Sequence, residues 1–402
     1  MDESIRELER GAPDDDTGRR LDLLEALARV GRTNEALAAL DLARIPGPWF
    51  PRAKELSEKL WADAITRLEP GITVPLGWKA DWVLAGSGEV VAHQEEQFGA
   101  TNVTELATGE LVHVIAPRRP GPWAEVHESK SLLSLADRII SADTREIVSL
   151  EWDGHRIIEE RHVFEVDSFD LLSVSPALDR VLLDDFARVE SDIPGMERFG
   201  VYRFPSLEPV LERRERLGEA VVDWSTRHLV CQDERGLVRA FPFDGGAPSS
   251  LALELDIEDT LVALRPGVLL CETLGVALHE IHGAWTLPLV ESCRQLDAPS
   301  ASSDGRGVRL VADGTPVRFD VDFATGCLDA KRKGARQLAR GWHPHADICS
   351  VRIDDDDRTE LRTLDGRILR NIAGGPPVWS RDGRVAVSRE RTDTLRVWKT
   401  RL

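Results

Sequence analysis

The chain has 402 residues, of which 42% are hydrophobic and 30% are charged. This is an ordinary globular composition, and it excludes disordered and fibrous proteins. The formal net charge of −19 repels phosphate backbones and anionic lipid surfaces, so we expect neither nucleic acid nor a membrane as a partner.

The amino terminus and the cysteines indicate a cytoplasmic location. The first ten residues are mostly charged, unlike a secretory signal, and no apolar stretch approaches the roughly 18 residues of a membrane span. The 5 cysteines are widely separated and form no Cys-x-x-Cys motif, which favours neither disulfides nor a zinc site. Only 7 of the 51 basic residues are Lys, a bias that we attribute to a GC-rich bacterial genome.

The first 70 residues are predicted to be helical. Apolar residues recur there at helical spacing, first around Leu21 to Ala28 and again from Ala36 to Ala43. We predict two helices joined at Gly31 and a third from Arg52 to Leu68. Pro-Gly pairs end the second and third helices.

The run from Leu24 to Pro46 resembles a single tetratricopeptide repeat. Gly31 ends its first helix, Ala36 and Ala43 lie in the second, and Pro46 closes the unit. Such modules need about three stacked units to bury their apolar faces. The resemblance therefore implies that residues 1–70 form a small helical cap that packs on the rest of the chain.

From residue 71 onward, short strands rich in Val, Ile, Leu and Trp alternate with Gly, Asp and Pro. Turns that would follow the first strand of a repeating unit recur about every 36 to 50 residues, the interval of β-propeller blades. They lie at Ser87–Gly88, Ala136–Asp137, Ser175–Pro176, Ser225–Thr226, Pro266–Gly267, Ser303–Asp304, Pro344–His345 and Arg381–Asp382. We therefore predict a mainly β protein in which residues 71–402 form a propeller of eight blades, with seven as the alternative.

The last 27 residues, 376–402, resemble one blade of a WD-repeat propeller. An apolar strand at Val378 is followed by the turn Ser380-Arg-Asp382-Gly383-Arg, a second strand, and a third that ends near Trp398. The last blade has Val397-Trp398-Lys399 where that family has Trp-Asp, so the resemblance is to a divergent WD-repeat-like protein. Because the last blade has only three strands, we expect residues 72–76 to supply the fourth and close the ring.

The sequence contains no Gly-x-Ser-x-Gly elbow, P-loop or dinucleotide-binding glycine motif. We therefore assign no catalytic residue and no cofactor. Propeller enzymes assemble their sites from several blades, so a hydrolase, lyase or oxidoreductase with a site at the central funnel remains the alternative. His343 and His345 flank a turn proline and are the candidate metal ligands, but histidines in such turns are usually solvated and we expect no metal.

Two segments are candidate partner-binding sites. Trp49 and Phe50 lie between two prolines, and they either fasten the helical cap to the propeller or form an exposed anchor for a partner. The other segment is the densest basic run of the chain: Lys331, Arg332, Lys333 and Arg336. It would either dock an acidic peptide, a nucleotide or a phosphate, or serve as a polar connection between blades.

These features favour an intracellular protein-interaction scaffold or regulatory subunit without catalytic activity. Helical repeats and propellers both present rigid, extended surfaces to partner proteins. The net negative charge predicts partners with basic segments, attracted electrostatically and released by salt.

Overall fold

The computed structural model describes most of the chain between Thr17 and Thr400. The described residues are 17–400 without 78–79, 95–99, 117–130, 136–137, 143–145, 165–168, 185–195, 217–219, 233–236, 256–258, 303, 335–338 and 354–356.

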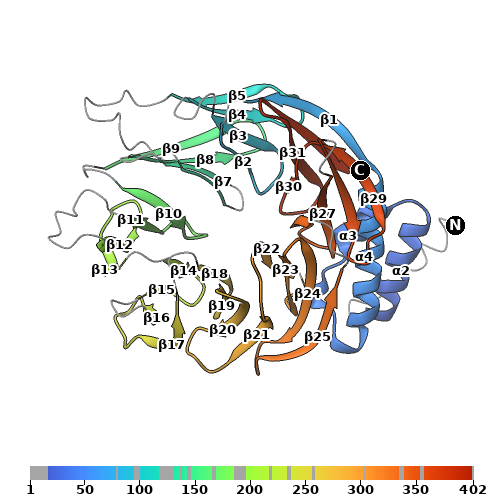
Figure 1. Ribbon diagram of the computed structural model, residues 1–402. Helices are drawn as coiled ribbons and strands as arrows, with labels where there is room; N and C mark the ends of the chain where they lie inside the picture. The colour runs from blue at the N-terminus through green and yellow to red at the C-terminus, as the bar shows by residue number, and fades with distance from the viewer. Residues whose placement is uncertain are drawn as a thin grey trace.

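Over the described residues, the strands form eight antiparallel sheets of four strands each, arranged as the blades of a ring (Figure 1). We number these blades from the amino terminus. Blade 1 contains β2 (Trp82–Leu84), β3 (Val90–Gln94), β4 (Thr101–Glu105) and β5 (Leu111–Ile115). Blade 2 contains β6 (Ser131–Ser134), β7 (Arg138–Ala142), β8 (Glu146–Trp152) and β9 (Ile157–Val163). Blade 3 contains β10 (Asp170–Val174), β11 (Arg180–Asp184), β12 (Met196–Arg203) and β13 (Pro209–Arg216).

The next three blades follow the same pattern. Blade 4 contains β14 (Val221–Asp223), β15 (His228–Gln232), β16 (Leu237–Pro242) and β17 (Ser249–Glu254). Blade 5 contains β18 (Thr260–Arg265), β19 (Val268–Glu272), β20 (Val276–Glu280) and β21 (Thr286–Val290). Blade 6 contains β22 (Leu296–Ala301), β23 (Gly307–Ala312), β24 (Thr315–Asp322) and β25 (Cys327–Lys333).

Blade 7 contains β26 (Ala339–Trp342), β27 (Ile348–Ile353), β28 (Arg358–Thr363) and β29 (Ile368–Ala373). Blade 8 joins the two ends of the ring. Blade 8 contains β30 (Val378–Trp379), β31 (Val385–Arg391), β32 (Thr394–Thr400) and β1 (Leu68–Pro75). Strand β1 pairs with β32 from Leu68 opposite Thr400 to Pro75 opposite Thr394. An early strand of the chain is therefore the outer strand of the last blade.

The predicted propeller with eight blades is confirmed, and the alternative of seven is wrong. Each of the six predicted turns that the structure describes in full falls between the first and second strands of one sheet. Residues 136–137 and Ser303, which belong to two of these turns, lie outside the described residues.

The core of the ring consists of apolar clusters between neighbouring blades. Leu270 of blade 5 and Phe319 of blade 6 belong to one such cluster, and both are buried. Val91 of blade 1 and Val397 of blade 8 belong to another, which completes the circle. Because strand residues alternate between two faces, each blade contributes one apolar face to each neighbour.

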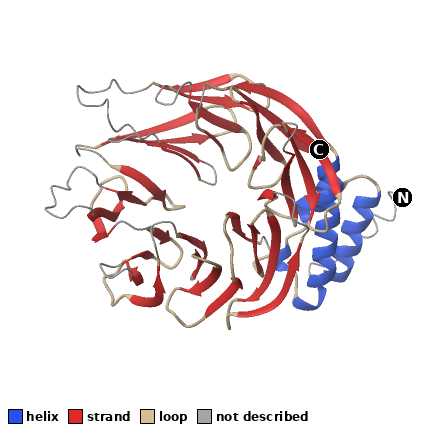
Figure 2. Cartoon of the chain, viewed as in Figure 1, coloured by secondary structure: helices blue, strands red, loops and turns tan. Residues whose placement is uncertain are grey.

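The described helices form a single unit on one side of the ring (Figure 2). We call this unit the helical cap. It consists of α2 (Thr17–Arg29), α3 (Thr33–Ala39), the short 3-10 helices η1 (Leu42–Arg44) and η2 (Gly47–Trp49), and α4 (Phe50–Thr66). None of the described helices is both long enough and apolar enough to traverse a lipid bilayer.

The cap shares one apolar cluster with blades 7 and 8. Leu60 and Ile65 of α4 belong to the same buried cluster as Ile348 and Trp398 of the ring. Helix α4 begins at Phe50, two residues earlier than predicted, because Pro51 favours the first turn of a helix. The second helix is shorter than predicted, because Leu40 adopts an extended backbone after Ala39.

Candidate functional site

Helix α4 lies over the turns that connect the first two strands of blades 6, 7 and 8. In blade 8, the Ser380 hydroxyl donates to the Asp382 carboxylate over 2.6 Å, and the Arg384 amide donates to the same carboxylate over 3.0 Å. In blade 6, Asp304 accepts the Arg306 amide in the same way, over 3.0 Å. The Ser-x-Asp-Gly-Arg motif therefore builds the turns on which the cap is seated.

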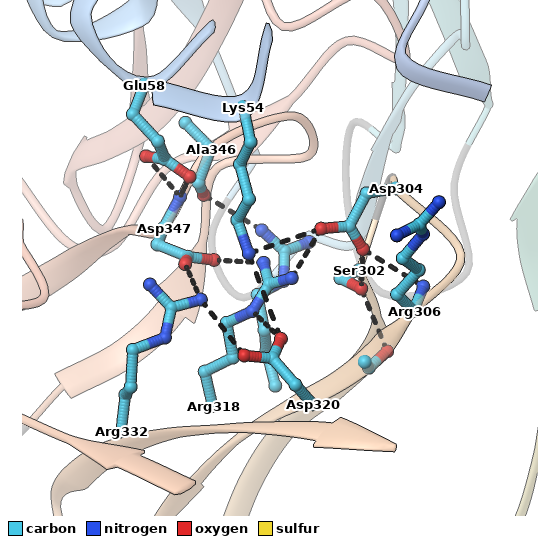
Figure 3. Close-up of polar contacts among 12 residues, drawn as sticks. Lys54, Glu58, Ser302, Asp304, Arg306, Arg318, Asp320, Arg332, Ala346 and Asp347 are labelled. Atoms are coloured by element: carbon cyan, nitrogen blue, oxygen red, sulfur yellow. Dashed lines mark hydrogen bonds and ion pairs between the residues drawn. The ribbon is translucent and has the colours of Figure 1, made fainter. Parts of the chain in front are cut away.

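A buried charged network lies where α4 meets blades 6 and 7 (Figure 3). At its centre is Arg318 of β24, whose side chain is only 3% exposed. Its guanidinium contacts three carboxylates: Asp304, Asp320 at 2.7 Å and Asp347 at 2.9 Å. Since Asp347 precedes β27, the network joins two blades.

Two further cations complete the network. Lys54 of α4 places its ammonium nitrogen 3.4 Å from Asp304 and 3.8 Å from Asp320. Arg332 of β25 lies 3.2 Å from Asp347 and 3.5 Å from Asp320. Each buried carboxylate is therefore balanced by cations, as buried charges require.

The pKa values of these groups follow from their burial and their neighbours. Burial acts to raise the pKa of Asp304, but the hydrogen bond from Ser302 and the charge of Arg318 outweigh it and hold this pKa well below its usual range. For Lys54, burial and then the charge of Arg318 lower the pKa. The pKa of Arg318 is raised because the carboxylates of Asp347 and Asp304 outweigh its desolvation.

Glu58 of α4 differs from the other acids at this interface. Its two carboxylate oxygens accept the Asp347 amide hydrogen over 3.2 and 3.1 Å. Burial, together with the nearby Asp347 carboxylate, raises the pKa of Glu58 to about 7. The contact of this helix with the ring therefore includes a carboxyl group that titrates near neutral pH.

The candidate metal ligands His343 and His345 pack against Trp61 of α4. The Trp61 ring lies 4.5 Å from the His343 ring and 5.5 Å from the His345 ring, measured between centroids. Nε2 of His343 lies 3.1 Å from the Gly383 carbonyl, and Nε2 of His345 lies 2.6 Å from the Arg381 carbonyl. Burial lowers the pKa of His343 to about 3.

These contacts give both histidines a packing role between cap and ring. Nε2 must carry a hydrogen to donate to a carbonyl, and Nδ1 of His343 accepts the His345 amide over 3.2 Å. Both ring nitrogens of His343 are thus occupied by the protein. Within the described ranges, no group of three or more His, Cys, Asp or Glu side chains is placed to hold a metal ion.

Trp49 and Phe50, predicted either to fasten the cap to the propeller or to anchor a partner, have different surroundings. Phe50 is buried, and the Arg306 guanidinium lies 3.7 Å from the centre of its ring. Trp49 is 40% exposed. Phe50 therefore contacts the propeller directly, whereas Trp49 remains accessible at the start of α4.

The predicted basic segment falls on the outer strand of blade 6. Lys331 donates to the Leu289 carbonyl of blade 5 over 3.3 Å. Arg332 enters the charged network, whereas Lys333 is exposed. Arg336 lies outside the described residues.

Sequence reasoning missed the members of the charged network other than Arg332. One available signal was the strand Val317–Val321, in which Arg318 and Asp320 alternate with buried apolar residues. Another was the spacing of Lys54 and Glu58, which places both on one face of a helix. Nothing local in the sequence places Asp347 beside Arg318.

Two grooves flank α4. The first, which we call the α3 groove, has a volume of about 800 Å³ and lies between the cap and the turns of blades 1, 7 and 8; Leu37, Leu40, Trp61, His345 and Arg384 are among its lining residues. The second, which we call the β25 groove, has a volume of about 850 Å³ and lies between α4, the end of β25 and the β28–β29 turn.

Comparisons with known proteins identify the fold but no family. No family model and no curated protein matches the sequence. The crystal structure of the computationally designed Ika8 protein is similar, with a TM-score of 0.54 at 15% identity over 81% of this chain and 98% of that one.

Two natural proteins are more distantly similar. BamB from Moraxella catarrhalis has a TM-score of 0.38 at 14% identity, over 79% of this chain and 83% of that one. A functionally unknown protein from Desulfotomaculum acetoxidans has a TM-score of 0.42 at 12% identity, over 69% of this chain and 93% of that one. At 15% identity, the similarity to the Ika8 protein concerns the overall fold alone.

Proposed function

We propose that the protein is a cytoplasmic interaction scaffold whose partners dock on the face formed jointly by the helical cap and blades 6–8. The observation that carries this proposal is the attachment of the cap to the ring. Buried ion pairs, the Trp61–His343 contact and one continuous apolar cluster hold α4 in place. A groove remains on each side of the helix.

Rigid, preformed grooves suit the binding of peptide segments, because little conformational entropy is lost by the scaffold. The α3 groove combines apolar side chains such as Leu37 and Leu40 with both acidic and basic residues. An apolar anchor surrounded by polar groups is the usual composition of a binding hot spot. The net charge of −19 favours basic segments on partners that approach the rest of the surface.

We further propose that the helical cap is a divergent tetratricopeptide-like unit and that the ring is WD-repeat-like; the predicted boundary at residues 70 and 71 is corrected to the end of α4 at Thr66, because β1 of the ring begins at Leu68. The left-handed Gly31, with a φ of +85° between α2 and α3, and the buried Ala36 support the first resemblance. The serine and aspartate turns of blades 6 and 8 support the second.

Affinity capture from native bacterial lysate tests the scaffold function. The wild-type chain is compared with Leu40→Asp, which changes the α3 groove, and with Leu274→Asp, a control at a side chain that is 88% exposed. A stoichiometric protein that is lost only with Leu40→Asp supports the proposal. Capture of no protein by the wild-type chain, at about 50 or 500 mM salt, contradicts it.

A further inference from the structure

The β25 groove is lined by as many basic as acidic side chains, on a protein whose net charge is −19. Its walls come from α4, from the end of β25, and from the β28–β29 turn. The four basic residues among its lining side chains are Lys59, Arg332, Lys333 and Arg367. The four acidic ones are Glu58, Asp63, Asp347 and Asp365.

The four acids are already engaged within the protein. Glu58 accepts the Asp347 amide, and Asp347 is paired with Arg318 and Arg332. Asp63 accepts the Thr33 hydroxyl over 2.8 Å and pairs with Arg67 at 2.9 Å. Asp365 accepts the hydroxyl of Thr363, and this bond lowers the pKa of Asp365.

Three of the four bases are not engaged in this way. Lys59, Lys333 and Arg367 are exposed, and within the described part of the chain none of them forms a salt bridge or donates a side-chain hydrogen bond. Arg367 lowers the pKa of Asp365 through its backbone amide and through its charge, and its side chain donates no hydrogen bond to this carboxylate among the described contacts. Asp63 and Asp347 are paired with cations other than these three bases. Lys59, Lys333 and Arg367 therefore outnumber the two remaining acids, Glu58 and Asp365, and the groove presents positive charge to a ligand.

The basic surface continues beyond the groove. Lys333 also lines a cavity of about 440 Å³, together with Lys331 and Arg294. Strand β25 is exposed along its whole length, and among the described strands it pairs with β24 alone. Beside the bases, the groove also offers apolar surface from Ala62, Leu364 and Leu369. This combination suits an extended segment that carries carboxylates and an apolar side chain.

We propose that the β25 groove binds an acidic, extended segment of a partner protein. This inference rests on the proposed scaffold function and specifies the partner chemistry of one groove. The carboxylates of the segment would pair with Lys59, Lys333 and Arg367, and its apolar side chain would contact Leu364 and Leu369. The rest of the acidic surface would repel such a segment, which restricts binding to this groove.

Fluorescence anisotropy with the full chain tests the inference. The probe is a fluorescein-labelled 12-residue peptide of Asp, Glu and Leu; its counterpart replaces every acid with Lys. We expect the acidic peptide to bind at low salt and the basic peptide not to bind at this groove. Lys333→Glu and Arg367→Glu should each weaken binding of the acidic peptide about tenfold or more, as expected for reversal of a charge at an interface.

Arg352→Glu, at an exposed site on β27, makes the same change in net charge outside the groove and should leave binding unchanged. The inference is overturned if Arg352→Glu weakens binding equally, if the acidic peptide does not bind, or if inorganic phosphate or a 12-nucleotide oligothymidylate displaces it at equal concentration. Circular dichroism checks the folding of each variant, and Lys333→Gln replaces any reversal that does not fold.

The lysate experiment separates this inference from the scaffold function. If the wild-type chain captures a partner that Lys333→Glu and Arg367→Glu retain, and the acidic peptide does not bind, the scaffold stands and the acidic ligand is wrong. If the peptide binds but no protein is captured, binding of an acidic segment at the β25 groove is supported and the scaffold function is wrong.

Discussion

Arg318 donates from its guanidinium to the carboxylate of Asp347 over 2.9 Å, and so links blade 6 to blade 7 directly beneath helix α4. Both side chains are almost completely buried. Since Arg318 also contacts Asp304 and Asp320, one guanidinium bridges three carboxylates from two blades. Because Lys54 and Glu58 of the cap contact Asp304 and Asp347, the carboxylates bound by Arg318 also connect the cap to the ring.

Removing the guanidinium should destabilise the protein strongly. Arg318→Ala leaves the Asp304 and Asp347 carboxylates buried without their main cation, and we expect a loss of about 3 to 5 kcal/mol in the free energy of unfolding. Arg332→Ala is the matched control, because its side chain is 44% exposed and should cost about 1 kcal/mol or less. Urea denaturation measures both, and equal losses would contradict the central role of Arg318.

Docking of α4 should weaken as the pH rises through neutrality. The pKa of Glu58 is raised from 4.5 to about 7 in the docked cap. Below about pH 4.5 the carboxyl is protonated whether α4 is docked or not. Between about pH 4.5 and pH 7 it is protonated only when α4 is docked. Its contribution is thus complete at low pH and is lost as the pH rises through about 7. The groups around it are Lys54 of α4 and Asp347, Arg318 and Arg332 of the ring.

Hydrogen exchange of the α4 amides, corrected for intrinsic rates, measures this dependence. We expect docking at pH 8 to be weaker than at pH 6 by an amount on the order of 1 to 2 kcal/mol. Glu58→Gln cannot ionise and should remove the difference. An unchanged difference in this variant would assign the titration to another group.

The contact between Gly383 and His343 should make Gly383→Ala costly. Gly383 has a φ of +73°, and an added Cβ would lie 2.6 Å from Nε2 of His343. Backbone strain and this clash together should cost about 3 kcal/mol. The control Gly154→Ala has a φ of +93° but no atom within 4 Å, so it should cost only about 1 to 2 kcal/mol. A thermal melt showing equal losses would exclude the steric contribution.

Closure of the ring by β1 should depend on one face of that strand. Val74 is 1% exposed and packs between blades 8 and 1, so Val74→Asp should cost about 4 kcal/mol or more, because it buries a charge without a partner. Thr73 is exposed on the same strand, and Thr73→Asp should change stability by about 0.5 kcal/mol or less. Chemical denaturation measures the stability of both variants. Similar losses of stability would contradict the prediction that only the buried face of β1 is needed for ring closure.

The repeating part of the fold was predictable because its signals are local. Turns such as Ser380–Gly383 and Ser175–Pro176 recur at blade intervals, and each lies where one strand returns against the next. The charged network was not predictable, because it depends on contacts between distant segments: Asp347 accepts from Arg318 of another blade, and its amide donates to Glu58 of the cap. Periodicity determines the blades but not which polar groups meet where the cap is seated.

The position of β1 in blade 8 has a consequence for synthesis on the ribosome. Helix α4 emerges early, but apart from Leu68 the buried ring residues of its apolar cluster lie between Ala346 and Trp398. At about 5 to 20 residues per second, the nascent helix waits on the order of tens of seconds for this surface to be made. Ribosome-arrested chains that end before Ala346 should therefore expose α4 to protease, whereas released full-length chains should protect it. During that interval the nascent chain carries an uncovered apolar helix that a chaperone can bind.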